Sequence, residues 1–136
     1  MEKRAAKKAK TAPRKLTSKN KALLAVSAGQ AIKALDPVII KVGKLVDYTD
    51  YFVIMHGEST RQVMAIVENI LALAGQTRTG IYGIEGEAEG RWVVIDLGDV
   101  VIHIFLKELR DFYELEKLWA DAPRIAVPES GPRAGN

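Results

Sequence analysis

The side chains of this sequence that could perform catalysis or bind metals form no convincing motif. His56 and His103 are the only histidines, and their separation matches no compact zinc-binding motif. Cysteine is absent, which excludes disulfides, cysteine nucleophiles, thiolate metal sites and iron–sulfur clusters. Asp96 and Asp99 are a conceivable Mg²⁺ pair, but they flank a predicted tight turn, and turn formation explains Asp99 more simply. We therefore predict no metal, no cofactor and no catalytic residue.

Motifs for nucleotide binding and nucleophilic catalysis are missing as well. The glycines of residues 80–86 lack the spacing of the dinucleotide-binding fingerprint and the helix that should follow it. The sequence contains no Walker motif. Ser59 has the side chain of a nucleophile, but it precedes a helical pattern whose first turn its hydroxyl would cap. These observations predict a protein that is not an enzyme.

Positive charge is concentrated at the N-terminus. Residues 1–21 contain nine Lys or Arg and one acidic residue, which leaves 22–136 with 11 basic and 16 acidic residues, a net charge of −5. A lysine-rich segment attracts RNA or any other polyanion without reading its sequence. The alternative interpretation is a solvated extension that improves solubility. In either case residues 1–18 are predicted to be a disordered basic tail.

The same N-terminal segment also indicates the cellular compartment of the protein. Its lysines are followed by no hydrophobic run before Leu23, which argues against a secretory signal. No apolar stretch in the chain is long enough to cross a bilayer. We therefore expect a cytoplasmic protein with no membrane partner.

Hydrophobic periodicity predicts one folded domain over residues 19–121. Short runs of β-branched and apolar residues predict five strands, at 38–42, 51–55, 79–84, 91–97 and 100–106. Helical patterns alternate with them, which is typical of an α/β (α+β) fold with a single mixed sheet of about five strands and flanking helices. Residues 122–136 are rich in proline and glycine, and are predicted to be a flexible C-terminal tail.

Three segments of the domain have a helical pattern. The first runs from about Lys19, and Pro37 marks its end. The second begins with Ser59 and Gln62, which are spaced as in a capping box, and Gly75 is predicted to cap its C-terminus. The third follows the last predicted strand and is expected to be continuous, with Leu118 and Trp119 anchoring it in the core.

The pair Gly98-Asp99 lies between the two strongest strand patterns and predicts a type II′ hairpin. With these two residues as the loop, Trp92 is opposite Phe105. Because side chains alternate along a strand, one face of this hairpin is then purely aliphatic and should face the core. It comprises Val93, Ile95, Leu97, Val100, Ile102 and Ile104.

The other face of the hairpin combines aromatic, aliphatic and polar side chains: Trp92, Val94, Asp96, Val101, His103 and Phe105. Asp96 and His103 lie diagonally across the strands, within reach of a hydrogen bond. Such a mixture is typical of the centre of a protein interface. The alternative is a second packed layer beneath a helix. A one-residue slip of the turn would exchange the two faces.

Two stretches resemble the signatures of a known family. The first runs from Asp50 to Val63, as an Asp, an apolar strand, a Gly, and a Ser followed by Arg61. The second comprises Gly83–Gly86, Arg91–His103 and Arg110–Trp119. Together they resemble the ribosomal silencing factor (Iojap) family over about residues 20–121.

This resemblance implies a function. Similar proteins bind the large ribosomal subunit through its fourteenth-numbered (uL-type) protein, block joining of the small subunit, and repress translation when nutrients fall. They commonly form homodimers. The family fold is related to nucleotidyltransferases but lacks their catalytic carboxylates, and no Asp-x-Asp pair follows Gly57–Ser59 here. A nucleotidyltransferase-like enzyme and a general RNA-binding module are the alternatives.

The resemblance also nominates site residues. The candidates for a ribosome or dimer interface are Trp92, Asp96, His103, Phe105, Arg110, Tyr113 and Glu116. All of these except Phe105 match signature positions of the family, as does Trp119. The His56 position is given no role. By hypothesis, the basic tail adds a contact with ribosomal RNA.

Overall fold

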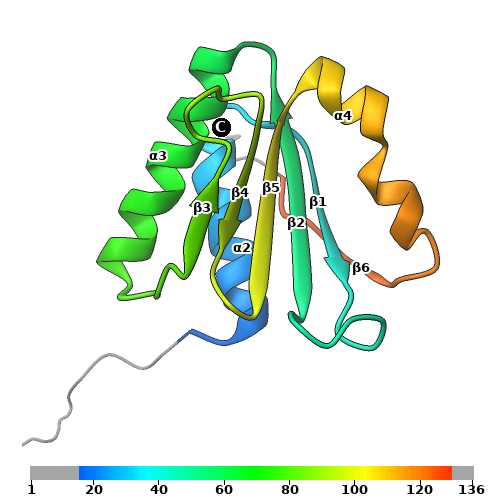
Figure 1. Ribbon diagram of the computed structural model, residues 1–136. Coiled ribbons are helices and arrows are strands. Elements are labelled where there is room, and N and C mark those ends of the chain that lie inside the picture. Colours follow the sequence, from blue (N-terminus) through cyan, green and yellow to red (C-terminus); the bar gives the residue numbers. More distant parts are fainter. Residues whose placement is uncertain (1–15, 130–136) are drawn as a thin grey trace, which may run out of the picture.

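A computed structural model describes residues 16–129, which form a mixed six-stranded sheet with helices on both faces (Figure 1). The strand order is β3-β4-β5-β2-β1-β6. The central pair β2 and β5 is parallel, and every other neighbouring pair is antiparallel. The strands are β1 Leu35–Lys41, β2 Tyr51–Gly57, β3 Gly83–Glu85, β4 Trp92–Asp96, β5 Val100–Leu106 and β6 Arg124–Ile125.

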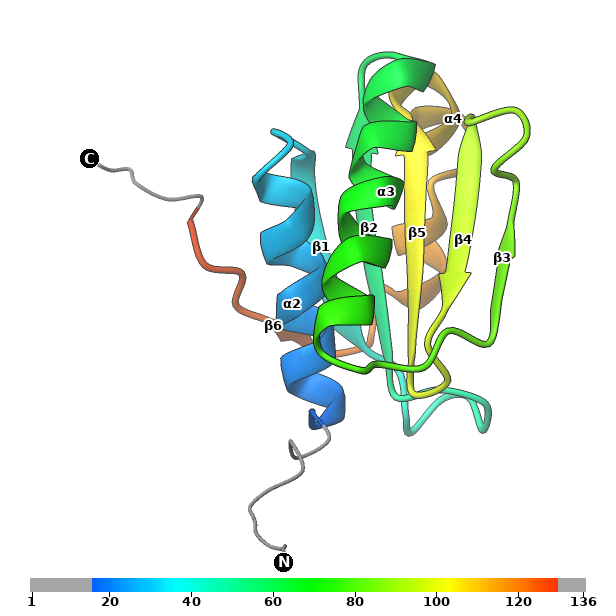
Figure 2. The same ribbon diagram turned by 90° about the vertical axis from the view of Figure 1, so that its left-hand side faces the viewer.

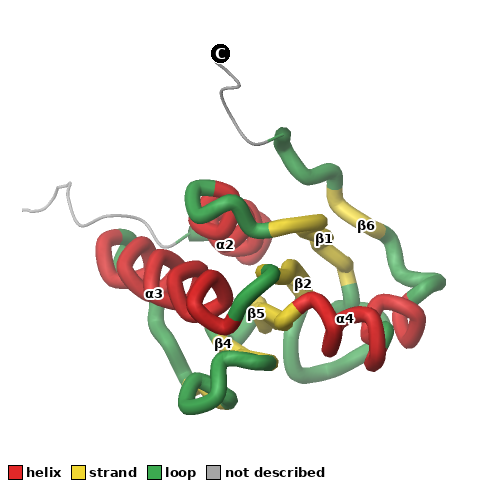
Figure 3. Tube along the Cα trace, turned by 90° about the horizontal axis from the view of Figure 1, so that it is seen from above, coloured by secondary structure: helices red, strands yellow, loops and turns green. Residues whose placement is uncertain are grey.

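The helices divide the sheet into two unlike faces. Helices α2 (Ser18–Gln30) and α3 (Thr60–Gln76) lie side by side on one face, as Figure 2 shows. Helix α4 (Lys107–Tyr113) and the short 3-10 helix η1 (Leu115–Trp119) lie on the other, as is seen from above in Figure 3. No helix in residues 16–129 has the length and apolar character to span a membrane.

The helix starts follow from local side-chain chemistry. The Thr17 hydroxyl accepts from the Asn20 amide at 3.1 Å, and the Ser59 hydroxyl accepts from the Gln62 amide at 3.1 Å, so α2 and α3 each begin with a capped amide. The Gln62 side chain accepts from the amide of Glu58, at 2.8 Å, and not from that of Ser59 as in an ideal capping box. The capping role predicted for Ser59 is confirmed.

Several element boundaries differ from the prediction. Gly75 lies inside α3, which continues to Gln76 and is capped at Thr77, so the predicted glycine cap is wrong. The third helical segment is not continuous, because Glu114 adopts a left-handed conformation (φ +48°) between α4 and η1. β3 keeps only the last part of the predicted 79–84 strand.

The hairpin of β4 and β5 has the predicted register. Trp92 pairs with Phe105 and Asp96 with Val101, and the Leu97 amide donates to the Val100 carbonyl at 2.9 Å. Gly98 has φ +90°, which a glycine adopts without strain. All six residues of the predicted aliphatic face are at most 2% exposed and pack under α2 and α3. The core assignment is therefore confirmed.

The two predicted tails meet the structure differently. Residues 1–15 of the basic tail lie outside the described residues, whereas Ser18 is the first residue of α2. The segment after residue 121 was expected to be loose, but Arg124–Ile125 form β6 and pair with β1. Gln30 also donates to the Pro128 carbonyl at 2.7 Å. The first part of this segment therefore belongs to the fold.

Candidate functional site

The face of the sheet beneath α4 and η1 carries a connected set of rings, here called the aromatic face. Trp92 is its centre, with ring centroids 4.7 Å from Phe105 and 5.0 Å from Tyr113. Phe112 contacts Tyr113 edge to face at 5.0 Å. The full set is Tyr48, Phe52, Trp92, His103, Phe105, Phe112, Tyr113 and Trp119.

Exposure increases across the aromatic face from its centre to its rim. Phe105 is fully buried and Trp92 half-buried, whereas Tyr113 is 50% exposed and Phe112 75% exposed. Leu118 of η1 is 73% exposed, so its predicted role as a core anchor is wrong. The side chains of the inner rings thus form a second packed layer, and the outer ones offer apolar surface to solvent.

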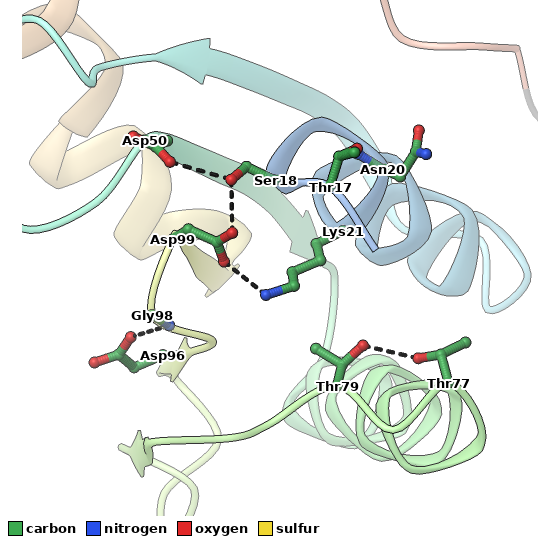
Figure 4. Close-up of polar contacts among 10 residues, drawn as sticks. All are labelled: Thr17, Ser18, Asn20, Lys21, Asp50, Thr77, Thr79, Asp96, Gly98 and Asp99. Carbon is green, nitrogen blue, oxygen red and sulfur yellow. Dashed lines mark hydrogen bonds and ion pairs between the residues drawn. The ribbon is translucent and has the colours of Figure 1, made fainter. Parts of the chain in front are cut away.

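The polar atoms on this face pair differently from the prediction. The Trp92 indole donates to Nδ1 of His103 at 3.1 Å. Asp96 accepts from the Gly98 amide at 2.7 Å, as Figure 4 shows. The expected hydrogen bond between Asp96 and His103 is therefore wrong. The reason is local: the turn amide lies within reach of the Asp96 carboxylate, and an Asp that accepts from the amide two residues on closes a tight turn.

The hydrogen bond from Trp92 fixes the state of His103. An indole N–H is only a donor, so Nδ1 of His103 must be unprotonated to accept from it. Burial lowers the pKa of His103 to about 4, because the charged imidazolium would lose its hydration. His103 is therefore neutral at physiological pH, and it holds the Trp92 ring in one orientation.

Arg110 is the most buried charged side chain of the site, with 6% of its surface exposed. Its guanidinium donates to the Glu116 carboxylate at 2.8 Å, to Nδ1 of His56 at 2.9 Å and to the Leu35 carbonyl at 3.3 Å. These bonds connect α4 to η1, β2 and β1. The left-handed turn at Glu114 is thus stabilised from the inside.

The charge state of each partner suits this network. Burial lowers the pKa of His56, and the nearby Arg110 lowers it further, so its Nδ1 is free to accept. Burial alone would raise the pKa of Glu116, but the hydrogen bonds and charge of Arg110 outweigh it and lower the pKa. The role of His56 was missed by sequence reasoning, since its only signal was a polar residue in an otherwise apolar strand.

A second polar network lies at the opposite end of the sheet (Figure 4). Ser18 Oγ is 2.6 Å from one oxygen of Asp99 and 3.1 Å from Asp50, and Lys21 Nζ is 2.9 Å from the other oxygen of Asp99. Burial would raise the pKa of Asp99, but Ser18 and Lys21 together lower it. Asp99 is therefore more than a turn residue, because it ties the hairpin to the start of α2.

The predicted interface residues are thus brought together unequally. Trp92, His103 and Tyr113 form one ring cluster with exposed surface. Phe105 and Arg110 are buried and support that cluster from within. Half-buried Glu116 pairs with Arg110, and half-buried Asp96 closes the hairpin turn. Phe112, which contacts Tyr113, and Leu118 of η1 were not selected as interface residues by sequence reasoning, and they are the most exposed apolar side chains of α4 and η1.

This combination of fold and site is typical of a protein-binding domain. Within residues 16–129, no three His, Cys, Asp or Glu side chains are grouped as metal ligands. The buried Arg110 pairs with Glu116, and the exposed aromatic and aliphatic side chains of α4 and η1 lie among charged ones such as Lys107 and Lys117. Exposed aromatic clusters of this kind are enriched at protein interfaces.

Comparison with known proteins identifies the family. Residues 15–135 match the family model described as "Ribosomal silencing factor during starvation" (RsfS). Ribosomal silencing factor RsfS of Halalkalibacterium halodurans is 43% identical over 104 residues, which cover 76% of this chain and 89% of that protein. The Chromobacterium violaceum RsfS is 34% identical over 110 residues, which cover 80% of this chain and 90% of that protein. The chain belongs to the RsfS family.

More distant relatives and solved structures agree with this assignment. The mouse "Mitochondrial assembly of ribosomal large subunit protein 1" is 43% identical over 89 residues, covering 63% of this chain and 39% of that protein. A crystal structure from Chromobacterium violaceum superposes with a TM-score of 0.76 at 32% identity, covering 88% of this chain and all of that one. A crystal structure from Bacillus halodurans superposes with a TM-score of 0.72 at 38% identity, covering 80% of this chain and 99% of that one. The predicted α/β fold and family are both confirmed.

Proposed function

We propose that this protein represses translation by binding the large ribosomal subunit and sterically blocking its association with the small subunit, above all when nutrients are limiting. The observation that carries this proposal is membership of the RsfS family over residues 15–135. The mouse relative, whose name refers to the large subunit, supports that choice of subunit. The proposed contact on the subunit is its fourteenth-numbered, uL-type protein.

The aromatic face is the proposed docking surface. Tyr113 and Phe112 of α4 and Leu118 of η1 are exposed, and Tyr113 contacts half-buried Trp92. Buried Arg110 supports the turn between the two helices. Interfaces of this composition gain most of their free energy from a few aromatic anchors. The mechanism needs no reaction, because a rigid body bound at the subunit interface excludes the second subunit. We therefore propose that the protein is not an enzyme, and that it acts in the cytoplasm.

Sedimentation with separated subunits tests the proposal directly. We expect the purified protein to co-sediment with large subunits, and to reduce joining when small subunits are added. Phe112→Ser and Leu118→Ser should weaken binding at least tenfold. Tyr82→Ser is the matched control, because Tyr82 is an equally exposed ring at 76% but packs beside Gly98 of the hairpin turn. Wild-type protein that stays unbound to large subunits would refute the function.

The oligomeric state and the role of the basic tail are tested by separate measurements. We propose that the free protein is a homodimer, which analytical ultracentrifugation would establish. We also propose that the basic tail contacts ribosomal RNA. Deleting residues 1–15, which keeps Thr17 and Ser18 at the start of α2, should then reduce the slope of log affinity against log salt, since fewer counterions are released on binding. An unchanged slope would remove the tail from the mechanism.

The nucleotidyltransferase-like alternative has a separate test. The carboxylates of Asp50 and Asp99 both approach Ser18, but Lys21 forms an ion pair with one of them. Isothermal titration calorimetry with nucleoside triphosphates and Mg²⁺ distinguishes the two functions. Heat of binding together with turnover would favour the enzyme.

A further inference from the structure

A pocket of about 280 Å³ opens on the rim of the aromatic face, between α4 and the loop that connects β3 to β4. It is lined by Gly86, Glu89, Arg91, Trp92, Leu109 and Tyr113. Trp92 and Tyr113 contribute two rings with centroids 5.0 Å apart and planes inclined by 42°. This volume lies just below the range of pockets that hold drug-sized ligands, and it can accommodate a single long side chain.

The aromatic walls of the pocket are held in place. The Trp92 indole is fixed by its hydrogen bond to His103 and by its contact with Phe105. Tyr113 is the last residue of α4, whose position the Arg110 network determines. The faces of such rings carry partial negative charge and attract cations. A preorganised aromatic pair therefore favours a positively charged occupant.

The loop on the other side of the pocket is equally constrained. Gly86 has φ +86°, and a Cβ there would lie 2.0 Å from the Trp92 carbonyl oxygen, so only glycine fits. The Gly90 amide donates to the Gly86 carbonyl at 3.0 Å and closes the loop. The backbone of Glu89 is thereby held at the pocket, and its side chain is exposed.

The charge of the loop has a definite sign. Glu85, Glu87 and Glu89 are all exposed, and Arg91 is the single basic residue between them and β4. This acidic edge would repel the phosphates of RNA. It complements a basic protein surface instead, and a lysine or arginine is the side chain that combines positive charge with a long apolar stem.

We propose that this pocket receives one lysine or arginine side chain from a basic protein partner, with Trp92 and Tyr113 contacting its stem and cation and Glu89 supplying the counter-charge. The inference rests on the proposed function, because it describes how the docking surface recognises its protein partner. Electrostatic complementarity of this kind sets the register of an interface and rejects wrong partners.

A charge-reversal pair tests the pocket in the assembled system. Glu89→Lys should weaken binding to large subunits at least tenfold. Glu68→Lys makes the same change in charge at an exposed position of α3, on the other face of the sheet, and should leave affinity within twofold. Equal effects of the two variants would overturn the proposal. Tighter binding of Glu89→Lys would also overturn it, and would identify RNA as the neighbour of this loop.

A test without ribosomes separates this inference from the proposed function. The indole N–H signals of Trp92 and Trp119 would be followed by NMR during titration with L-arginine amide, against sodium chloride at equal ionic strength. The Trp92 signal should shift in a saturable way while that of Trp119 does not, and Glu89→Gln or Tyr113→Leu should reduce the shift at least threefold. If wild-type protein did not bind large subunits but gave this pattern, the proposed function would be refuted and the proposed pocket supported. A Trp92 signal whose chemical shift does not change would overturn the proposed pocket.

Discussion

The two faces of the sheet use different chemistry. The face under α2 and α3 is aliphatic, and its six hairpin residues are at most 2% exposed. The face under α4 and η1 is built from rings, and exposure rises from none at Phe105 to 75% at Phe112. Aliphatic burial stabilises the domain without direction, whereas rings with polar atoms leave a shaped, partly exposed surface. The comparison indicates that stability resides mainly in the aliphatic face, while the other face leaves aromatic surface exposed, as the proposed docking surface requires.

The largest effect is expected on the aliphatic face. Ile102→Ala should lower the free energy of unfolding by about 3–4 kcal/mol, because the removed methyl groups leave a cavity at a fully buried position. The side chain of the preceding residue, Val101, is half-buried on the aromatic face, and Val101→Ala should cost about 1 kcal/mol. Urea denaturation measures both. Equal losses would contradict the division between the faces.

Arg110→Met is expected to have the next largest effect. The substitution leaves the Glu116 carboxylate, Nδ1 of His56 and the Leu35 carbonyl without their donor. We expect a loss of about 2–3 kcal/mol, below that of a fully buried pair because Glu116 keeps 23% of its side chain exposed. A double-mutant cycle with Glu116→Gln isolates the pair. Additive effects of the two substitutions would show that the pair is not coupled.

The pH dependence of stability should report His103. Because its pKa is lowered in the fold from 6.5 to about 4, the native state resists protonation. The stabilisation is complete above pH 6.5 and is lost as pH falls toward 4. The loss in unfolding free energy is about 2 kcal/mol at pH 5. His103→Asn keeps an acceptor for Trp92 but cannot titrate. The difference in unfolding free energy between wild type and variant should therefore change between pH 8 and pH 5, and a constant difference would contradict the assignment.

A smaller effect is expected at the Lys21–Asp99 pair. Its side chains are 17% and 30% exposed, so solvent screens their attraction. Lys21→Met should cost about 0.5–1 kcal/mol at low salt, and less when sodium chloride is added. Thermal unfolding at two salt concentrations measures this. A loss as large as that of Arg110→Met would mean that the two networks are equally buried.

The smallest effect on stability is expected at the exposed rim of the aromatic face. Phe112→Ser should change the free energy of unfolding by no more than about 0.5 kcal/mol, because its ring is 75% exposed. Its effect on subunit binding should nevertheless be large. Denaturation of the variant used for sedimentation provides this comparison. A large loss of unfolding free energy in Phe112→Ser would show that Phe112 belongs to the core.

Periodicity predicted the parts of the fold that repeat a local pattern. The hairpin register followed from a two-residue glycine turn, and the α3 stripe followed from helical spacing. The boundaries that failed depend on single dihedral angles or on partners far along the chain. Glu114 adopts a left-handed turn where the pattern is helical, and β6 forms because β1 offers an unpaired edge.

The fold brings several of the nominated site residues together, but their contacts differ from the predicted ones. Trp92, His103 and Tyr113 were selected from the hairpin face and the family signature, and the fold brings them together. The pairing of His103 with Trp92 in place of Asp96 depends on distances between side-chain atoms, which strand alternation does not define. His56 and Arg110 are 54 residues apart, and no local pattern connects them.

The sequence by itself determined the family, the order of most elements and the division of the hairpin into an aliphatic and a ring-bearing face. These properties depend on residue type and on spacing along one chain segment. Only the tertiary structure decided which rings reach solvent, how Arg110 is neutralised and where a pocket forms beside Trp92. Those properties arise from side chains of distant segments packed within a few ångströms of each other, and spacing along the chain does not encode such distances.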